Sequence, residues 1–483
     1  MISVKKTEYH LLLIIMLAGI FTSCRNNEVK PELAENDKME LNSPWDKADE
    51  IVRNMIVPEF ADRTFNVKDF GAVPDGTTNN SSAFSAAIKA CYEAGGGKVI
   101  VPRGKYLTGP IHLLSNVNFH LEEGTEILFS KYTSDYLPVV QTSYEGMEFM
   151  NYSPLIYAYR QKNIAVTGKG TFNGQAGNDN WWPWSSAPRY GYKEGDNNQR
   201  SEHNLPRLSK MVEKGVPVSE RIFGEGHQFR PTFFQPFECE NVLIKDVTFI
   251  YAPFWVMHLV KSSYVTVDGV TVDSHGPNND GCNPEYSKNV HIKNSVFDTG
   301  DDCIAIKSGR DNDGRRVGIK SENIVIEDNI MKDGHGGVVI GSEISGGVSN
   351  VYVRNCEMSS PNLERAIRIK TNTRRGGTIE NIYVKNIKVG QVKEAFLKIN
   401  THYAIYDNQE GEHMPVIRNI FLEDIEVENG GEYGILIKGR EASPVTNVKL
   451  TNVHIKNAGT PFQIEFADPL NYENVTINGK KME

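Results

Sequence analysis

The chain of 483 residues lacks an excess of basic residues, because 52 Lys and Arg stand against 61 Asp and Glu, a formal net charge of -9. Proteins that bind nucleic acid usually carry a positive surface that neutralises phosphates, so this balance argues against such a partner. The chain also has too little cysteine for a disulfide-dense scaffold, since only six are present. An anionic ligand would need a local group of cationic side chains.

Long apolar runs are absent. An apolar run at residues 11–21 follows Lys5 and Lys6, but it is too short to span a hydrocarbon core of about 30 Å. Residues 1–24 are therefore predicted to be a targeting segment that is removed. The segment ends in Phe21-Thr22-Ser23-Cys24, which resembles a bacterial lipobox and predicts lipidation of Cys24. Ordinary secretion with an incidental Cys24 is the alternative. Both readings predict export, and the first predicts a cell-envelope protein that meets the membrane only through its N-terminal lipid.

The next segment, 25–60, is predicted to be a polar tether and lead-in, because its first part is rich in Asn, Glu and Lys. Five cysteines follow Cys24, so they cannot all pair within one chain. Cys282 and Cys303 each lie two residues past an aspartate, which would stack them if successive repeats superpose. We favour small buried thiols, and a disulfide between them is the alternative.

The sequence has no long 3.6-residue periodicity and instead repeats one strand pattern, an anchor residue followed by alternating β-branched and polar residues. Successive anchors are 23 to 38 residues apart, so loops absorb the variation in length. The pattern predicts an all-β, right-handed parallel β-helix over 61–483, with Asn visiting left-handed backbone angles and bonding along the stack. A leucine-rich repeat is the rival, but its spaced leucines are missing. The anchors are Asn241, Tyr264, Asn289, Asn323, Asn350, Asn381, Asn419, Asn447 and Asn474.

Two segments depart from the repeat. A short helix near residues 82–94 is predicted to cap the open N-terminal end of the solenoid and block edge-to-edge pairing. Residues 175–236 form an insertion with three tryptophans and few strand patterns. Its aromatic side chains would either provide a sugar platform or pack into a small core of their own.

Four short elements follow one another within about 90 residues, and similar offsets from their anchors predict that they share one face of the solenoid, a few strand spacings of about 4.8 Å apart. They are Asn278-Asn279-Asp280, Gly300-Asp301-Asp302, Gly334-His335-Gly336 and Arg368-Ile369-Lys370.

These residue types suit cleavage of a glycosidic bond, which needs one carboxylic acid to protonate the leaving oxygen and a carboxylate to activate water. Adjacent Asp301 and Asp302 would both reach the site only if Gly300 bends the chain. Crowded carboxylates also raise the pKa of one member. Arg368 and Lys370 alternate around Ile369, so both face the same way, as binding of a substrate carboxylate requires.

Order, spacing and context resemble glycoside hydrolase family 28, the polygalacturonases and their relatives, over residues 60–480; Asn279 departs from the family's Thr. The resemblance implies an inverting hydrolase of α-1,4 galacturonosyl linkages in pectin that needs no metal or other cofactor. It implies that Asp301 is the general acid and that Asp280 and Asp302 position and deprotonate water. It also implies that Asn278 and His335 support the site and that Arg368 and Lys370 bind the galacturonate carboxylate.

The resemblance to exo-acting members extends to residues 372–377 and 253–255, so exo action is expected, and a self-sufficient solenoid predicts a monomer. A hydrolase of rhamnogalacturonan or substituted pectin is the first alternative. A calcium-dependent pectate lyase and a non-catalytic glycan-binding β-solenoid are the others.

Overall fold

The computed structural model describes residues 43–403 and 410–483. The predicted targeting segment, the lipidation site Cys24 and the tether up to residue 42 lie outside the described residues. Among the described residues, no helix combines the length and apolar character needed to cross a membrane.

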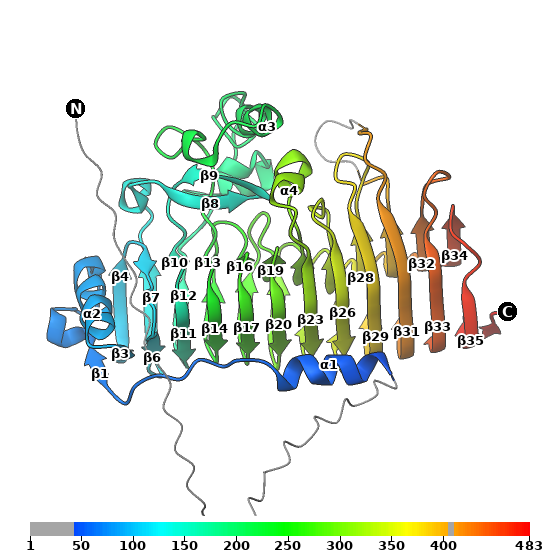
Figure 1. Cartoon of the computed structure of the whole chain (residues 1–483), viewed down its shortest axis with the longest axis horizontal. Helices are drawn as coiled ribbons and strands as arrows, with labels where there is room; N and C mark the ends of the chain where they lie inside the picture. Colours follow the sequence, from blue (N-terminus) through cyan, green and yellow to red (C-terminus); the bar gives the residue numbers. More distant parts are fainter. Residues whose placement is uncertain (1–42, 404–409) are drawn as a thin grey trace, which may run out of the picture. The chain divides into compact units, whose positions relative to one another are not determined.

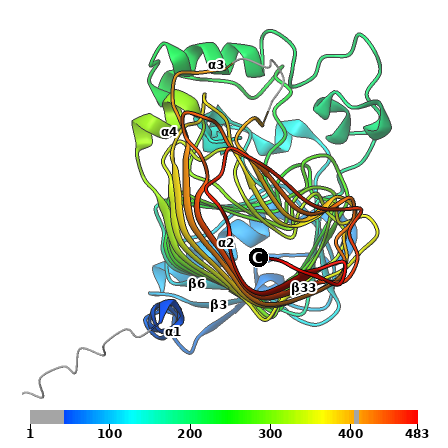
Figure 2. The same cartoon turned by 90° about the vertical axis from the view of Figure 1, so that its right-hand side faces the viewer.

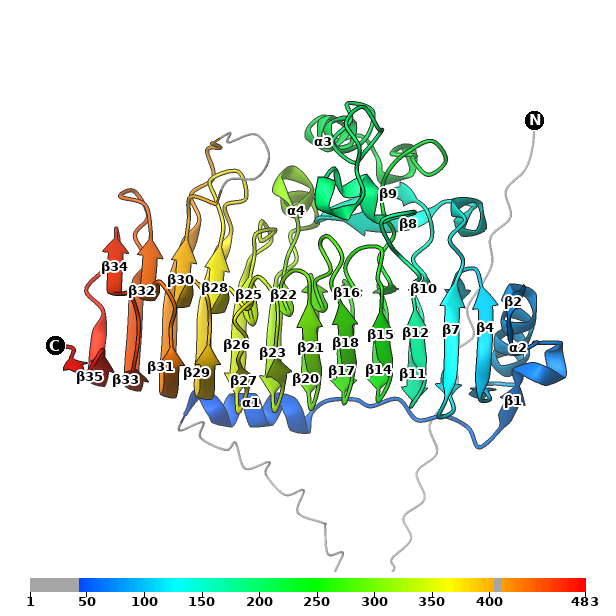
Figure 3. The same ribbon diagram turned by 180° about the vertical axis from the view of Figure 1, so that it is seen from behind.

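The described residues from Ser43 onward form a right-handed parallel β-helix, as predicted, in which each turn of the chain adds strands to sheets that run the length of the stack (Figure 1, Figure 3). The sheet that carries the functional motifs pairs its strands in chain order, all parallel. Its strands are β5 (Ile111–His112), β10 (Ile156–Tyr159), β13 (Phe234–Phe237), β16 (Met257–Val260), β19 (Cys282–Glu285), β22 (Ile304–Ile306), β25 (Val338–Ile340), β28 (Arg365–Lys370), β30 (Ala395–Asn400), β32 (Tyr433–Lys438) and β34 (Thr460–Glu465).

The other walls form one larger sheet. Its strands are β1 (Thr64–Asn66), β2 (Asp75–Asn79), β3 (Gly97–Val101), β4 (Gly104–Thr108), β6 (Val117–Leu121), β7 (Thr125–Phe129), β11 (Lys162–Gly168), β12 (Thr171–Asn173), β14 (Glu240–Lys245), β15 (Thr248–Ile250), β17 (Ser263–Asp268), β18 (Thr271–Ser274), β20 (Lys288–Lys293), β21 (Val296–Thr299), β23 (Ser321–Glu327), β24 (Ile330–Met331), β26 (Val348–Arg354), β27 (Glu357–Met358), β29 (Thr378–Gln391), β31 (Val416–Asn429), β33 (Thr446–Ile455), β35 (Asn471–Ile477) and β36 (Lys480–Lys481).

The predicted asparagine anchors stack along this sheet. Asn323 has φ 58°, and its Nδ2 donates a hydrogen bond of 3.1 Å to Oδ1 of Asn289 on the preceding coil. The same contact recurs from Asn350 to Asn323 and onward to Asn447, so side-chain amides satisfy one another along the turn. The last predicted anchor is wrong in register: Asn474 bonds Asn452 rather than Asn447, because Val475 pairs with Val453.

The residue after each anchor points into the solenoid and builds a continuous aliphatic column. All members are at most 2% exposed, so this column supplies much of the hydrophobic stabilisation of the stack. In register they are Val242, Val265, Val290, Ile324, Val351, Ile382, Ile420 and Val448.

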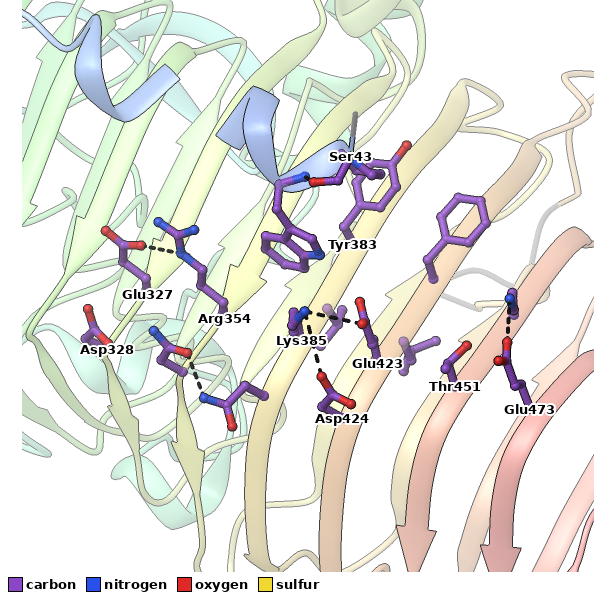
Figure 4. A pocket seen from close by; sticks show the side chains of 18 residues that line it. Ser43, Glu327, Asp328, Arg354, Tyr383, Lys385, Glu423, Asp424, Thr451 and Glu473 are labelled. Carbon is purple, nitrogen blue, oxygen red and sulfur yellow. Dashed lines mark hydrogen bonds and ion pairs between the residues drawn. The ribbon is translucent and has the colours of Figure 1, made fainter. Parts of the chain in front are cut away.

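Helix α2 (Ser81–Glu93) lies at the N-terminal end of the stack, as predicted, with Phe84 against Phe119. Helix α1 (Pro44–Arg53) falls within the segment predicted to be a polar tether and lead-in, and it was missed. It begins at a capping box on Ser43 (Figure 4) and lies along the outside of the larger sheet (Figure 2). Asp49 of this helix accepts a hydrogen bond of 2.8 Å from Arg354. Trp45 packs edge-on to Tyr352, at a distance of 6.1 Å between ring centroids.

The insertion at 175–236 contributes Leu208 and Phe229 to a small separate core, while its tryptophans pack against the core of the solenoid. Trp181 is buried against Tyr136, with ring centroids 5.5 Å apart, and therefore offers no free face. Helix α3 (Leu205–Glu213) packs on an antiparallel hairpin of β8 (Val140–Tyr144) and β9 (Met147–Asn151). Both lie on the same side of the solenoid as α4 (Asp311–Val317) (Figure 1). The 3-10 turns are η1 (Val67–Phe70), η2 (Thr133–Tyr136), η3 (Trp182–Ser185), η4 (Pro188–Tyr190) and η5 (Val218–Glu220).

The five cysteines of the described residues are buried free thiols. The predicted stacking of Cys282 on Cys303 is wrong, because the strand partner of Cys282 is Ile304, one residue further on. The loops before β19 and β22 differ in length, so equal distances from the motif aspartates do not give equal registers.

Candidate active site

The four motif elements meet on one face of the solenoid, as predicted. Asp280 precedes β19, Asp301 and Asp302 lie between β21 and β22, and His335 lies between β24 and β25. Arg368 and Lys370 lie on β28, with Ile369 between them buried in the core. One carboxylate oxygen from each of the three aspartates lies within 4.8 Å of the others.

The bend at Gly300 allows both neighbouring aspartates to reach the site. A Cβ atom at Gly300 would lie 2.5 Å from the carbonyl oxygen of Gly276, so no other residue fits this close approach. The chain turns here instead of continuing as a strand, and the N–H of Asp302 donates a hydrogen bond of 2.9 Å to Oδ1 of Asp301.

Each carboxylate has its own cationic partner. Nδ1 of His335 lies 3.0 Å from Oδ1 of Asp301. Nζ of Lys370 lies 2.7 Å from Oδ2 of Asp302, whose other oxygen is 3.4 Å from Nη1 of Arg368. Nζ of Lys307 lies 3.5 Å from Oδ2 of Asp280. The sequence analysis missed Lys307; the available signal was a lone lysine directly after an apolar strand, five residues past Asp302.

These contacts shift the pKa values of the group. Asp301 raises the pKa of His335 to about 9, and burial only partly opposes this. Burial alone would raise the pKa of Asp301, but His335 outweighs it and leaves that pKa well below the usual range. Lys370 and Arg368 likewise outweigh burial and lower the pKa of Asp302. Burial, together with nearby Asp301, raises the pKa of Asp280. At neutral pH the proton that this pair can give up therefore lies on the imidazole of His335, and Asp301 is ionised.

The aspartates open into a cavity of about 330 Å³. Tyr403 lies beside two cations that line this cavity. The centroid of its ring is 5.5 Å from the guanidinium carbon of Arg368 and 5.2 Å from Nζ of Lys370. Glu145, at the tip of the β8–β9 hairpin, reaches the same cavity and pairs with Arg310 at 2.8 Å. The cavity is lined by Glu145, Trp255, Asn278, Asp280, Asp301, Asp302, Lys307, His335, Ser342, Glu343, Glu364, Arg365, Arg368, Lys370 and Tyr403.

The insertion is joined to the site through Arg230, which is 1% exposed. Its Nη2 donates to Oδ1 of Asn278 at 2.7 Å and to Oε1 of Gln199 at 2.9 Å. Asn278 has φ 54°, a left-handed angle that Asn tolerates, and this angle directs its side chain towards Arg230. The position of Asn278 thus depends on residues far away in the sequence.

Two groups of side chains among the described residues bring three ligand atoms close enough to share a cation. One is the aspartate triad, where the ammonium, guanidinium and imidazole groups described above already face the carboxylates. The other is His275 with Asp298 and Asp333, where Nε2 of His275 lies 3.0 Å from Oδ1 of Asp298. The chemistry of the triad is therefore that of carboxylates balanced by protein cations.

The family model described as Glycosyl hydrolases family 28 matches residues 221–475. The chain belongs to this family. A second model, Rhamnogalacturonase A/epimerase, pectate lyase-like, matches residues 64–180. The protein is thus a glycoside hydrolase of the polygalacturonase family, and this membership implies a pectic polysaccharide as substrate.

Individual relatives agree with this assignment. The structure of a hyperthermoactive exopolygalacturonase from Thermotoga maritima is 44% identical, with a TM-score of 0.87, over 91% of this chain and 97% of that chain. The exo-poly-alpha-D-galacturonosidase of Dickeya chrysanthemi is 26% identical over 86% of this chain and 71% of that protein. A Vitis vinifera protein named "Probable polygalacturonase" is 29% identical over 80% of this chain and 73% of that protein.

Proposed function

We propose that this enzyme removes galacturonate units from the end of polygalacturonate by hydrolysing α-1,4 linkages with inversion. The observation that carries the proposal is the aspartate triad within 4.8 Å, set directly beside the paired cations Arg368 and Lys370. Carboxylates provide acid and base, and the cations match a uronate carboxylate.

The proton for the leaving group comes from the His335–Asp301 pair. It moves from Nδ1 of His335 to Oδ1 of Asp301, across the 3.0 Å that separates them, and then to the glycosidic oxygen as the bond from that oxygen to C1 breaks. Water held between Asp280 and Asp302 attacks C1 and releases its proton to one of these carboxylates. The atoms balance, and Asp301 is the proton donor as the family resemblance implies.

The cations proposed to bind the uronate carboxylate already have an anionic partner. Arg368 and Lys370 both contact Asp302 in the structure, so an incoming uronate carboxylate joins an existing group of charges. Both cations are less than 10% exposed, and little water has to be displaced from them. Tyr403 holds them in place from the side.

Inversion is supported by the family resemblance but not by the spacing of the carboxylates. Inverting enzymes usually separate their two carboxyl groups by about 6.5–9.5 Å, and retaining enzymes by about 5–5.5 Å. The oxygens here approach within 4.8 Å. We place the water between Asp280 and Asp302 rather than between acid and base.

Exo action is supported by two observations. The Thermotoga maritima structure that resembles this chain over nearly its whole length is that of an exopolygalacturonase. The β8–β9 hairpin also places Glu145 in the cavity, and Arg230 ties the insertion to Asn278 beside it. A cavity bounded in this way favours a chain end over an internal segment of polymer.

We also propose that the enzyme is exported and held at the cell envelope by a lipid on Cys24, with no other membrane contact, and that it acts as a monomer. Incorporation of labelled palmitate that is lost in Cys24→Ser would support the anchor, and labelling that persists in the variant would contradict it. Sedimentation of the soluble protein tests the monomer.

The decisive experiment incubates residues 25–483 with polygalacturonate and separates the products over time. Early release of galacturonate or its dimer alone is expected, whereas a ladder of oligomers would make the enzyme endo-acting. No release, with activity on rhamnogalacturonan or substituted pectin, would favour the first alternative. An unsaturated product that absorbs in the ultraviolet would instead identify a lyase.

A further inference from the structure

Lys307 lies at the centre of a buried row of charges that the motifs do not include. It follows β22, is 3% exposed, and its Nζ lies 3.2 Å from Oε2 of Glu343 and 3.5 Å from Oδ2 of Asp280. The carbonyl oxygen of Gly341 accepts a hydrogen bond of 3.3 Å from the same ammonium group. The indole of Trp255 covers it, with its ring centroid 4.5 Å from Nζ.

Glu343 pairs with the same ammonium group as Asp280. Its own carboxylate accepts a hydrogen bond of 2.7 Å from Ser342 and lies 3.8 Å from Nη2 of Arg375. Lys307 and Arg375 together lower the pKa of Glu343 to about 2 despite its burial. Lys307 is therefore clamped between two carboxylates and has no room to swing towards solvent.

Among the described residues, Asp280, like Asp301, has one cationic partner. Asp302 has two cationic partners and Asp301 has His335, while Lys307 is the single ion-pair partner of Asp280 in residues 43–403 and 410–483. Asn283 also donates a hydrogen bond of 3.0 Å from its side chain to the same Oδ2. Lys307 and Asn283 both contact Oδ2 of Asp280, which leaves Oδ1 to face the cavity.

Charged groups on neighbouring elements act on Asp280 in opposite directions. Asp301 and Asp302, from the bend before β22, disfavour its ionised form. Lys307, at the end of β22, and Lys370, on β28, favour that form. Since Lys370 is in contact with Asp302, Lys307 provides the nearest compensation.

We propose that Lys307 is a positioning residue that favours the ionised form of Asp280 against the effects of burial and Asp301, with one oxygen directed at the water, so that Asp280 acts as the base. This inference rests on the proposed hydrolytic function. The ammonium group keeps its proton throughout the reaction and takes no part in bond making.

The test compares Lys307→Met with Lys261→Met, a matched control. Lys261 is also an ion-paired lysine over an aromatic ring, with Nζ 5.5 Å from the ring centroid of Phe237 and 3.6 Å from Glu238, but it does not line the cavity. The acid limb of the pH profile of kcat/KM reports the ionisation of the base in the free enzyme. Loss of a neighbouring cation raises a carboxyl pKa, so in Lys307→Met this limb should move up by at least about one pH unit.

The limb of Lys261→Met should coincide with that of wild type. A folded Lys307→Met variant with an unshifted acid limb would overturn the proposal. Lys307→Arg keeps the charge and covers the case in which the methionine variant does not fold. Its limb should stay within about 0.3 unit of wild type, and a shift of a full unit would show that charge is not the cause.

A readout without substrate separates this inference from the proposed function. The infrared carbonyl band of the protonated Asp280 carboxyl, identified by its loss in Asp280→Asn, should titrate at higher pH in Lys307→Met than in wild type. If wild type cleaves no pectic substrate, the proposed function fails, while this titration still decides the role of Lys307. Equal titration in the two proteins would overturn it.

Discussion

Nδ1 of His335 and Oδ1 of Asp301 lie 3.0 Å apart, and the backbone N–H of the same histidine donates to the carbonyl oxygen of the same aspartate, also at 3.0 Å. The two residues come from successive coils, so this double contact fixes the proton donor across the stack. The pair holds one proton, with the pKa of His335 raised to about 9. Delivery of an acidic proton near neutral pH therefore does not require an isolated carboxylic acid.

His335→Gln should move the alkaline limb of the kcat/KM profile to lower pH. Asp301 would then hold the proton alone, and an ordinary aspartate has a pKa of about 3.9. The profile on oligogalacturonide measures this shift. His454→Gln, on the C-terminal coils, serves as the control and should keep the limb in place, and an unmoved limb in His335→Gln would assign the proton to another group.

The same pair should contribute to stability below about pH 9. A histidine whose folded pKa is raised stabilises the protein fully below its unfolded pKa of about 6.5, and this contribution is lost as the pH rises through about 9. The melting temperatures of wild type and His335→Gln, measured by thermal unfolding between pH 6 and pH 10, should therefore converge as the pH rises. A constant difference between the two would contradict the linkage.

Asp301→Asn should lower kcat by about 10²–10⁴-fold, because the variant cannot pass a proton to the leaving oxygen. Its denaturant midpoint should be close to that of wild type at about pH 10, where the His335–Asp301 pair no longer contributes to stability, since Asn keeps the side-chain shape. Asp298→Asn, two residues before the bend, is the matched control and should remain active. Near-normal turnover of Asp301→Asn would remove this residue as the acid.

Proton NMR of the first products should detect the β-anomer, because inversion at an α-linkage gives that configuration before mutarotation. The carboxylate oxygens within 4.8 Å make this a stringent test of the proposed water position. An initial α-anomer would indicate retention and assign one of the bases as a nucleophile.

Five thiols should react with a thiol reagent in denaturant without reductant when the protein starts after Cys24, and close to none in the native state. The cysteines of the described residues are all buried and free, and burial raises the pKa of Cys239 and Cys356 to about 12. A count of three after denaturation would reveal a disulfide.

Trp45→Ala should destabilise the protein by about 2 kcal/mol without a change in kcat. The indole attaches α1 to the outside of the solenoid next to Tyr352, and neither residue lines the catalytic cavity. Tyr132→Ala removes a side chain that is 74% exposed and should have no effect on the denaturant midpoint. A matching loss in both variants would show that α1 contributes nothing specific.

The sequence by itself determined the solenoid and the residues that gather on one of its faces. Period-two strands after asparagine anchors can bury their β-branched residues only by stacking, and stacking forces Asp280, Asp301 and Asp302 onto neighbouring coils. The bend at Gly300 and the shared direction of Arg368 and Lys370 also follow from local backbone rules, and both were predicted.

Only the tertiary structure decided which groups compensate one another. Lys307 is held by Glu343 and Trp255, and Asn278 is held by Arg230, through contacts between residues far apart in the sequence. The register of the strands was also set by the tertiary structure. Cys282 pairs with Ile304, and Asn474 donates a hydrogen bond to Asn452. Loop lengths shift the strand register without changing the strand pattern, and charges interact through space. Local sequence periodicity therefore predicts neither the strand register nor the charge contacts.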